Sequence, residues 1–375
     1  MKVAYFIGSL NRGGTEMLTL DICRCQASAP YEMIIIYRND GELSEEYRAT
    51  GVKMIRLKPE KNGYLSYLLA MRSLLKSENV NVLHAQTMTN GLFSVLCTMF
   101  TSVKLVSSFH GFFYGFKNLI IRHVVMWGSD VTIYVSNYVR NWYVRHSLVN
   151  PEKCVTIYNG IDFSKFDVAY PEPDFLHKTD SVPPIKNNNS ERKIRLAMVG
   201  NFVSGRSQNV ILKSLQLLRE RGVNNFVFYF IGKRAESEPW CYDSCVRYAN
   251  EHNMNGLVFF AGSRGDIPAI LQHIDGFVYS TEHDTFGIAV VEAMASGIPV
   301  VANDWEVMQE ITHNGKWAWL YHTEDIEDAA RAIHNLLLNI KEYRQIATKQ
   351  ISAVRNEYSI KKHIKRLYGI YSSII

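Results

Sequence analysis

Residues 276–302 read GFVYSTEHDTFGIAVVEAMASGIPVVA and carry the clearest structural signals of the chain. The run Gly276–Tyr279 is short and apolar, which is typical of a buried strand. An acidic loop follows, and Phe286-Gly287 opens a mostly apolar helical run that stops at Gly297 before a second apolar run over 298–302. A strand, a loop, a helix and another strand in this order predict one unit of a parallel α/β sheet.

The same alternation extends over most of the chain. The expected strands are 2–7, 33–37, 53–57, 80–84, 104–109, 131–135, 154–157, 194–199, 226–231, 257–260, 276–279 and 298–302. Several are apolar on both faces, as a sheet covered by helices on both sides requires. Proline-rich, polar sequence interrupts the alternation over 167–192. We therefore predict an α/β fold with two Rossmann-like domains, 1–166 and 193–358, a linker over 167–192, and a final helix, 359–375, that crosses back to the first domain.

The composition excludes several classes of protein. Hydrophobic residues make up 47% of the 375 residues, so the chain is globular rather than disordered. A net charge of +5 is too small over this length to indicate a nucleic-acid partner. The six cysteines form neither a zinc pattern nor a disulfide framework, and we find no signal peptide or membrane span. We expect a cytoplasmic chain.

Two short segments in the first domain are candidates for ligand binding. Gly13 and Gly14 stand between the first strand and a helix, where backbone amides are available to an anion such as phosphate. A strand-to-helix turn without a ligand is the alternative interpretation. His110 follows the strand 104–109 directly and would face the open edge of the sheet. A loop histidine that only caps the strand is equally compatible with that position.

The acids of the decisive stretch are the strongest candidates. Asp284 precedes the helix and Glu292 lies two turns into it. One acid at a loop suits sugar hydroxyls, and one within the helix suits a ribose. The amides of Phe286, Gly287 and Ile288 would face a phosphate or a developing negative charge. Taken singly, each acid is explained as well by an N-cap or a solvated helix residue.

The block 284–301 resembles the signature of the family-4 retaining glycosyltransferases of the GT-B fold, the bacterial polysaccharide-type glycosyl transferase group 1. That signature has two acids separated by seven residues and then an Ala-Met/Leu-Ala-x-Gly-x-Pro-Val run. Four further segments resemble the family in the correct order: Gly13-Gly14, His110-Gly111, Ile157–Asp162 and Val199–Phe202.

The resemblance implies transfer of a sugar from a nucleotide-diphosphate donor to an acceptor hydroxyl with retention of configuration, without a metal or other cofactor. It assigns catalytic roles to His110, Arg206, Asp284 and Glu292. It assigns donor binding to Gly13, Gly14, Asn201, Arg206, Gly262, Arg264, Glu282, Phe286, Gly287, Ile288 and Glu292. In these roles Asp284 holds the donor sugar, Glu292 the ribose, and Arg206 the diphosphate.

The sequence departs from the family in two places that bear on the donor. The first acid of the pair is usually Glu, but here it is Asp284, and Glu282 is placed to share or replace its role. Asn201 and Arg206 stand where the family has Arg and Lys. One cation is therefore lost, and Lys233 or Arg234 either replaces it or belongs to a solvated turn.

We expect a glycan or a lipid-linked sugar as the acceptor, with peripheral contact to the inner face of the cytoplasmic membrane. Aromatic and basic residues mix over 112–127 and 134–146, which suits an anionic lipid surface as well as two ordinary amphipathic helices. The aromatic cluster 110–116 is the expected acceptor side. Two rival functions remain: a nucleotide-sugar epimerase or hydrolase of the same fold, and a decayed sugar-nucleotide or glycan-binding protein.

Overall fold

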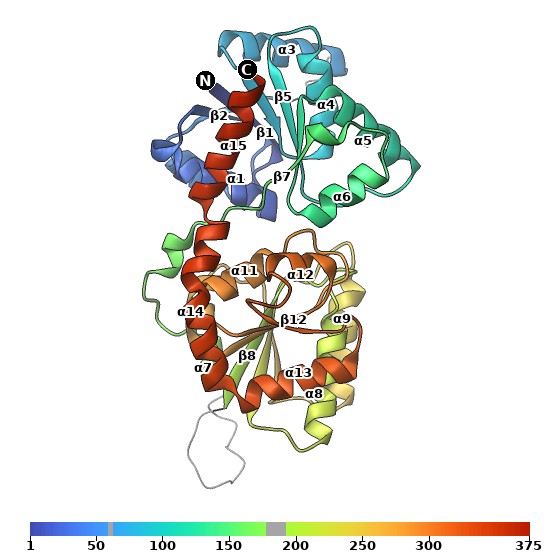
Figure 1. Cartoon of the computed structure of the whole chain (residues 1–375), viewed down its shortest axis with the longest axis vertical. Coiled ribbons are helices and arrows are strands. Elements are labelled where there is room, and N and C mark those ends of the chain that lie inside the picture. Colours follow the sequence, from blue (N-terminus) through green and yellow to red (C-terminus); the bar gives the residue numbers. More distant parts are fainter. Residues whose placement is uncertain (59–62, 178–192) are drawn as a thin grey trace. The chain divides into compact units, whose positions relative to one another are not determined.

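The computed structural model describes residues 1–58, 63–177 and 193–375. They form two compact units, one of Met1–Asp162 with Tyr358–Ile375 and one of Phe163–Glu357. Each unit has a parallel sheet with helices between its strands, so the predicted pair of α/β domains is confirmed (Figure 1). Of the expected linker 167–192, residues 178–192 lie outside the described residues.

The first unit contains a seven-stranded sheet in the order β3-β2-β1-β4-β5-β6-β7. Its strands are β1 (Lys2–Ser9), β2 (Glu32–Asn39), β3 (Lys53–Arg56), β4 (Val82–Ala85), β5 (Lys104–Phe109), β6 (Val131–Tyr134) and β7 (Cys154–Thr156). All pairings are parallel, and the central strands are buried on both faces. Parallel strands require crossover helices, which explains their mostly apolar sequences.

Helices cover the two faces of this sheet. The helices of the unit are α1 (Gly14–Arg24), α2 (Ser44–Ala49), α3 (Gly63–Ser77), α4 (Met88–Thr98), α5 (Phe116–Gly128), α6 (Asn137–Arg145) and α15 (Ile360–Ile374). One core cluster joins α1 and α15 to the sheet, and another joins α3 and α4 to it. Helix α4 packs against both α3 and α5.

The C-terminal helix α15 belongs to the first unit although the second unit precedes it in sequence. Its Tyr371 is fully buried, with its hydroxyl 3.2 Å from that of Tyr5 and 2.5 Å from Nδ1 of His84. The Tyr5 hydroxyl in turn lies 2.7 Å from that of Tyr31. Buried polar groups need such partners, so this chain of hydroxyls fixes how α15 packs on the sheet.

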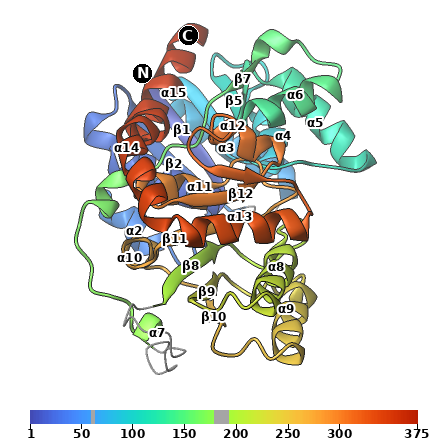
Figure 2. The same ribbon diagram turned by 60° about the horizontal axis from the view of Figure 1, so that its bottom comes forward.

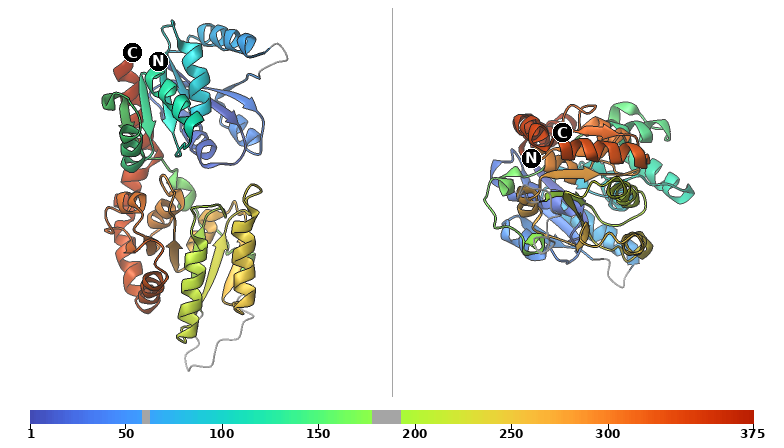
Figure 3. Two further views of the ribbon diagram at one scale, coloured as in Figure 1. Left: turned by 90° about the vertical axis from the view of Figure 1, so that its right-hand side faces the viewer. Right: turned by 90° about the horizontal axis from the view of Figure 1, so that it is seen from below.

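The second unit contains a six-stranded parallel sheet in the order β10-β9-β8-β11-β12-β13. Its strands are β8 (Ile194–Val199), β9 (Phe226–Ile231), β10 (Val258–Gly262), β11 (Gly276–Tyr279), β12 (Val300–Asn303) and β13 (Trp319–Tyr321). Its helices are α7 (Asp174–His177), α8 (Gln208–Glu220), α9 (Pro239–Glu251), α10 (Ile267–His273), α11 (Ile288–Ala295), α12 (Glu306–Ile311), α13 (Ile326–Leu338) and α14 (Ile340–Tyr358). Helix α8 packs against α9 and α13 (Figures 2 and 3).

The structure differs from the sequence-based prediction in a few places. The short edge strand β13 is absent from the sequence-based prediction, because it has only three residues, two of them half-buried, and follows a turn rather than a long apolar run. The helix after the acidic loop begins at Ile288, since Gly287 adopts a left-handed conformation with φ of +86°. Residues Phe163–Phe166 form a 3-10 turn, η3, of the second unit, four residues before the expected boundary, because η3 packs against α10.

Candidate active site

The centre of the candidate site in the second unit is an ion pair between two side chains that follow neighbouring strands. Arg206 comes after β8 and Asp284 after β11. Nη2 of Arg206 donates to Oδ1 of Asp284 at 2.7 Å, and the Tyr279 hydroxyl donates to Oδ2. The guanidinium also lies over the Tyr279 ring, 5.7 Å from its centroid. Three groups from two strand ends therefore hold one another in place.

The electrostatics of this cluster follow from its burial. Burial by itself would lower the pKa of Arg206, but the Asp284 carboxylate beside it raises that pKa above its usual range. Burial also raises the pKa of Tyr279 well above its ordinary value, so the phenol stays protonated as a donor. Arg206 is therefore always charged, and the neutral Tyr279 hydroxyl holds its counter-ion, the Asp284 carboxylate, in place.

One donor in the cluster has no acceptor among the described residues. The Nε–H of Arg206 is buried, and no hydrogen-bond partner is present for it in the part of the chain that the structure describes. The arginine side chain lies against the backbone at Gly200, where a Cβ would come within 2.5 Å of Nη1. Buried donors are usually paired in native proteins, and the Nε–H groups of Arg38 and Arg122 are unpaired among the described residues as well, so what distinguishes Arg206 is its place beside Asp284.

Glu292 lies on α11 and is placed as the sequence predicted, within the helix that follows Asp284. Its side chain is 12% exposed, and its Oε1 lies 3.5 Å from Nζ of Lys165 in η3. The N-cap of α11 is Gly287, which has no side chain to cap the helix start. Backbone amides at a helix start attract anions in general, and the binding of a phosphate at this end of α11 stays a prediction.

The other predicted donor-binding residues have structural partners of their own. The Asn201 side chain accepts from the Lys233 amide at 3.0 Å, which fastens the two loops after β8 and β9. Glu282 accepts from the Ser207 hydroxyl at 2.5 Å, next to the ion pair. Arg264 donates to Asp266 at 2.8 Å and lies over the Phe175 ring, and Gly262 ends β10 with φ of +67°.

Lys233 and Arg234 fit the solvated-turn interpretation. Lys233 pairs with Glu236 at 3.6 Å, and Arg234 forms a two-bond pair with Asp243 at 2.8 and 2.7 Å. All four side chains are about half exposed or more. Among the described residues neither cation pairs with Asp284 or Glu292, whose basic partners are Arg206 and Lys165.

The first unit presents a different chemistry at its strand ends. His110 follows β5, and its Nε2 lies 3.2 Å from Oε1 of Gln86, which follows β4. Burial and the neighbouring His363 lower the pKa of His110 to about 4. His363 has a pKa of about 4 as well, mainly from burial, and His84 is lowered well below its usual value for the same reason. The histidines here are neutral hydrogen-bonding groups at physiological pH.

Gly13 and Gly14 stand at the carboxyl end of β1, in the same unit as His110. Gly13 is the extended N-cap of α1 and Gly14 is its first residue. Gly13 has no side chain to cap this helix start, and a Cβ on it would come within 2.5 Å of a carboxylate oxygen of Glu16. Burial raises the pKa of that Glu16 carboxyl. The helix start is therefore close to a carboxyl group, a feature that the sequence analysis overlooked.

The aromatic and basic segments 112–127 and 134–146 are more internal than the sequence suggested. The rings of Phe112, Tyr114 and Trp142 contact one another. Arg122 is 7% exposed and donates to the His146 carbonyl, while Arg140 donates to the Cys154 carbonyl at 2.6 Å. Two of the basic residues in these segments, Arg122 and Arg140, are thus hydrogen-bonded to backbone carbonyls within the unit.

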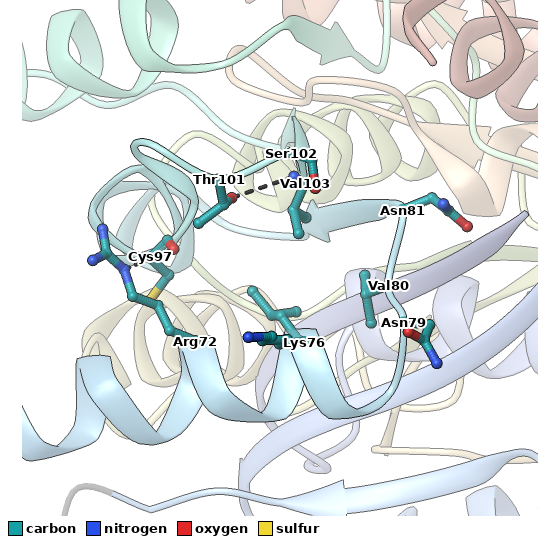
Figure 4. A pocket seen from close by; sticks show the side chains of 10 residues that line it. Arg72, Lys76, Asn79, Val80, Asn81, Cys97, Thr101, Ser102 and Val103 are labelled. Carbon is teal, nitrogen blue, oxygen red and sulfur yellow. Dashed lines mark hydrogen bonds between the residues drawn. The ribbon is translucent and has the colours of Figure 1, made fainter.

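A pocket of about 500 Å³ lies in the first unit, away from these residues. Figure 4 shows Arg72 and Lys76 of α3 on one side of it and Thr101 and Ser102, from the turn before β5, on the other. Since this turn precedes β5 and His110 follows it, the pocket is at the opposite end of the sheet from the predicted site residues.

Sequence reasoning missed three residues of the second-unit site: Lys165, Tyr279 and Trp305. The Trp305 indole donates to the Asp284 carbonyl at 3.0 Å, beside the carboxylate that Tyr279 holds. The sequence identifies Tyr279 as the end of a strand. A tyrosine there with an acid five residues later, Asp284, is the signal that could have predicted their hydrogen bond. The pairing of Lys165 with Glu292 joins positions 127 residues apart, which no local pattern reveals.

Comparison with known proteins agrees with this architecture. The sequence model described as "Glycosyltransferase Family 4" matches residues 12–165, and the one described as "Glycosyl transferases group 1" matches residues 183–352. Among solved structures, a glycosyltransferase from Rickettsia africae superposes with a TM-score of 0.85 at 19% identity, over 100% of this chain and 98% of that one. HepE from Anabaena, in complex with UDP and glucose, gives a TM-score of 0.84 at 16% identity and full coverage of both chains.

Curated relatives give the same picture at the sequence level. A Campylobacter jejuni N,N'-diacetylbacillosaminyl-diphospho-undecaprenol alpha-1,3-N-acetylgalactosaminyltransferase is 24% identical and covers 98% of this chain and 99% of its own length. An Escherichia coli UDP-Gal:alpha-D-GlcNAc-diphosphoundecaprenol alpha-1,3-galactosyltransferase is 22% identical, and the match covers 82% of this chain and 79% of that protein.

Two parallel-sheet α/β domains with these structural neighbours define the GT-B fold. With one family model on each domain, the chain belongs to the group 1 glycosyltransferases of this fold. In the described ranges, no helix has both the length and the apolar character needed to cross a bilayer.

Proposed function

We propose that this glycosyltransferase transfers a sugar from a nucleoside-diphosphate donor to a glycan or lipid-linked acceptor with retention of configuration, in the synthesis of a surface polysaccharide or glycolipid. The observation that carries the proposal is the buried, unpaired Nε–H of Arg206 beside Asp284. A guanidinium with a free donor suits a diphosphate oxygen, because its planar fork binds phosphate through two bonds.

Arg206 then stabilises the charge that grows on the diphosphate as the bond to the sugar breaks. Stabilising developing charge with a fixed, buried cation is usually the largest single contribution to such catalysis. The amides at the start of α11 add to it, and Arg206 needs little reorganisation because Asp284 already holds it. This account uses no metal, and we propose that transfer does not require one.

Asp284 and Glu292 bind the donor through their carboxylates. One oxygen of Asp284 accepts from Arg206 and the other from Tyr279, and each oxygen has a further lone pair for a sugar hydroxyl. Glu292 would accept from the ribose hydroxyls, with Lys165 limiting its rotation. His110, kept neutral by burial, would exchange hydrogen bonds with an outer hydroxyl of the sugar.

The choice of uridine as the donor nucleotide is supported by relatives. HepE was solved with UDP and with UDP-glucose, and the Escherichia coli relative is named for UDP-galactose. Two relatives are named for acceptors linked to undecaprenyl diphosphate, which supports a lipid-linked sugar as the acceptor of this chain.

A thermal-shift screen with UDP-, GDP- and ADP-sugars tests the proposal. We expect UDP-sugars to raise the unfolding midpoint, and transfer to an undecaprenyl-diphosphate sugar to continue in the presence of EDTA. Proton NMR of the product should show the anomeric configuration of the donor. An inverted product or release of free sugar without transfer would contradict retention, and donor binding without turnover would favour the decayed binding protein.

A further inference from the structure

The first unit holds an arginine, Arg38, whose charge has no counter-ion among the described residues. Arg38 is next to last in β2, at the carboxyl edge of the sheet, and a Cβ on Gly8 of β1 would lie 3.9 Å from its Nη2. We propose that Arg38 and Tyr67, here called the Arg38 site, bind a diphosphate group of the acceptor. This inference rests on the proposed function, because the lipid-linked acceptor proposed above carries its sugar on a diphosphate.

Two neighbours hold the Arg38 guanidinium in one place. Its Nη2 donates to Oδ1 of Asn90, which is fully buried in the first turn of α4. Nδ2 of Asn90 donates in turn to the Phe6 carbonyl at 3.1 Å. The guanidinium also lies over the Phe6 ring, 5.4 Å from its centroid. The group is therefore fixed by β1 and by the start of α4, as a preorganised binding residue requires.

No carboxylate compensates the charge of Arg38 in the part of the chain that the structure describes. The acid nearest to it in sequence is Asp40, which pairs with Arg56 at 2.8 Å and with Arg48 at 3.6 Å. Arg38 is half-buried, and a charge that loses hydration without gaining a partner costs free energy. An anionic ligand would offset that cost.

Two hydrogen-bond donors at this place are buried and have no acceptor among the described residues. They are the Nε–H of Arg38 and the hydroxyl of Tyr67, which lies on α3 and is 4% exposed. Burial raises the pKa of Tyr67 to about 12, and the nearby charge of Arg38 opposes part of that rise. The two groups are therefore neighbours, and the hydroxyl keeps its proton. A phosphate group offers several acceptor oxygens, so one such group suits both donors.

Arg122 of the same unit is a useful contrast, since its Nε–H is also unpaired among the described residues. It lies in the middle of α5, is only 7% exposed, and stacks over the Trp142 ring at 5.2 Å. A ligand has little access to such a side chain. Arg38 is more exposed and lies at the sheet edge where Gly13 and His110 also lie. Accessibility therefore separates the two arginines.

The position of Arg38 along the sheet edge fits the dimensions of a lipid-linked sugar. The strand order β3-β2-β1-β4-β5 places β1 and β4 between Arg38 on β2 and His110 after β5. Neighbouring strands are about 4.8 Å apart, so three steps separate the two positions by roughly 14 Å. This spacing leaves room for one acceptor sugar between the transferred sugar, proposed to lie at His110, and a diphosphate at Arg38.

Calorimetric titration of the full chain with geranyl diphosphate, at a saturating concentration of UDP, tests the Arg38 site. The probe carries a diphosphate on a short isoprenoid chain, and UDP occupies the donor site. We expect the wild type to bind it. Arg38→Gln removes the charge and keeps an N–H donor for Asn90, and it should weaken binding of the probe about 10- to 100-fold. Tyr67→Phe should weaken it about 2- to 10-fold.

Arg56→Gln is the matched control, because Arg56 lies on the neighbouring strand β3 and its charge is already paired with Asp40. We expect its affinity for geranyl diphosphate within twofold of the wild type. The unfolding midpoint of Arg38→Gln without ligand should not fall, since a charge without a counter-ion does not stabilise the fold. A lower midpoint, with equal losses of affinity for UDP and for geranyl diphosphate, would mean that Arg38 supports the fold and would overturn the proposal.

Failure of the Arg38 site and failure of the proposed function give different results. If UDP binds but geranyl diphosphate does not, or if Arg38→Gln binds the probe as tightly as the wild type, the Arg38 site is wrong and the donor assignment stands. If UDP does not bind but the probe binds in an Arg38-dependent way, the donor assignment is wrong and the Arg38 site stands. Arg38-dependent binding of sodium glucuronate, without binding of geranyl diphosphate, would indicate a sugar carboxylate as the ligand and would overturn the proposal.

Discussion

The side chains that follow the strands are charged in one α/β unit and neutral in the other. In the second unit Arg206 and Asp284 are a buried pair of full charges, with Tyr279 fixing the carboxylate. In the first unit His110 and His363 are uncharged, because burial lowers their pKa to about 4. The same sheet architecture therefore supports charge stabilisation in one unit and neutral hydrogen bonding in the other. A nucleoside diphosphate suits the former, and sugar hydroxyls suit the latter.

The largest effect is expected at Arg206. Arg206→Ala should lower kcat by about 10²–10³, since loss of one preorganised group that stabilises developing charge costs about 3–4 kcal/mol. Steady-state kinetics, measured below the unfolding midpoint of the variant, check this value. Arg206→Lys should recover part of the rate, because it restores the charge without the fork.

Arg234→Ala is the matched control, since Arg234 is exposed and pairs with Asp243 in a solvated turn. We expect its kcat within twofold of the wild type. If Arg234→Ala lowered kcat as much as Arg206→Ala, Arg234 would be the cation that replaces the one missing from the family pattern. The solvated-turn interpretation of Arg234 would then be wrong.

The histidine cluster of the first unit predicts a pH dependence of stability. In the folded chain the pKa of His363 is about 4, whereas an unfolded histidine titrates near 6.5. The unfolded state therefore binds more protons between these values, so the free energy of unfolding falls as the pH drops from 6.5 towards 4. One such histidine contributes about 3 kcal/mol over this window.

Urea unfolding at pH 7.5 and pH 5 measures the change, and His363→Gln should reduce it by the share of His363, leaving the shares of His110 and His84. His322 of the second unit is the control: it is exposed, and its hydrogen bond with Asp304 raises its pKa. His322→Gln should leave the loss of stability between the two pH values in place. A pH dependence unaffected by His363→Gln would contradict the neutral cluster.

A smaller effect is expected at Glu292. Glu292→Ala should weaken UDP binding about 10- to 100-fold, the range for loss of a hydrogen bond to a charged group. It should correspondingly remove the UDP-induced thermal shift, whereas Glu310→Ala on α12 should keep it. A full shift in Glu292→Ala would exclude the ribose role.

Tyr279→Phe gives the smallest expected effect, about tenfold on kcat with the donor KM nearly unchanged. The substitution removes the bond that fixes Asp284 but leaves the ring under Arg206. Steady-state kinetics separate the two parameters. A loss confined to KM would mean that Tyr279 supports donor binding rather than the position of Asp284.

Local patterns predicted the fold well because parallel strands are short apolar runs with clear ends. The predicted ranges 104–109, 194–199, 226–231 and 276–279 match β5, β8, β9 and β11 residue for residue. The motif around Asp284 and Glu292 likewise identified one loop and one helix of the site. Strand β13 was not predicted, because an edge strand of three residues lacks such an apolar run.

The remaining features depend on contacts between distant segments. The partner of Arg206 is 78 residues away and that of Glu292 is 127 residues away, so only the folded sheet brings them together. The burial of Arg122 and the hydrogen bond from Arg140 to the Cys154 carbonyl are equally invisible to composition, which is why the segments 112–127 and 134–146 looked more basic than their surface is.

Calorimetric titration with UDP and with uridine, in the wild type and in Arg206→Ala, tests the central claim most directly. If Arg206 binds the diphosphate, the wild type should prefer UDP over uridine by a factor of 10² or more, roughly two charge-assisted hydrogen bonds. Arg206→Ala should reduce that preference to about tenfold or less, with little change in uridine affinity. An unchanged preference, or an equal loss for both ligands, would contradict the role assigned to Arg206.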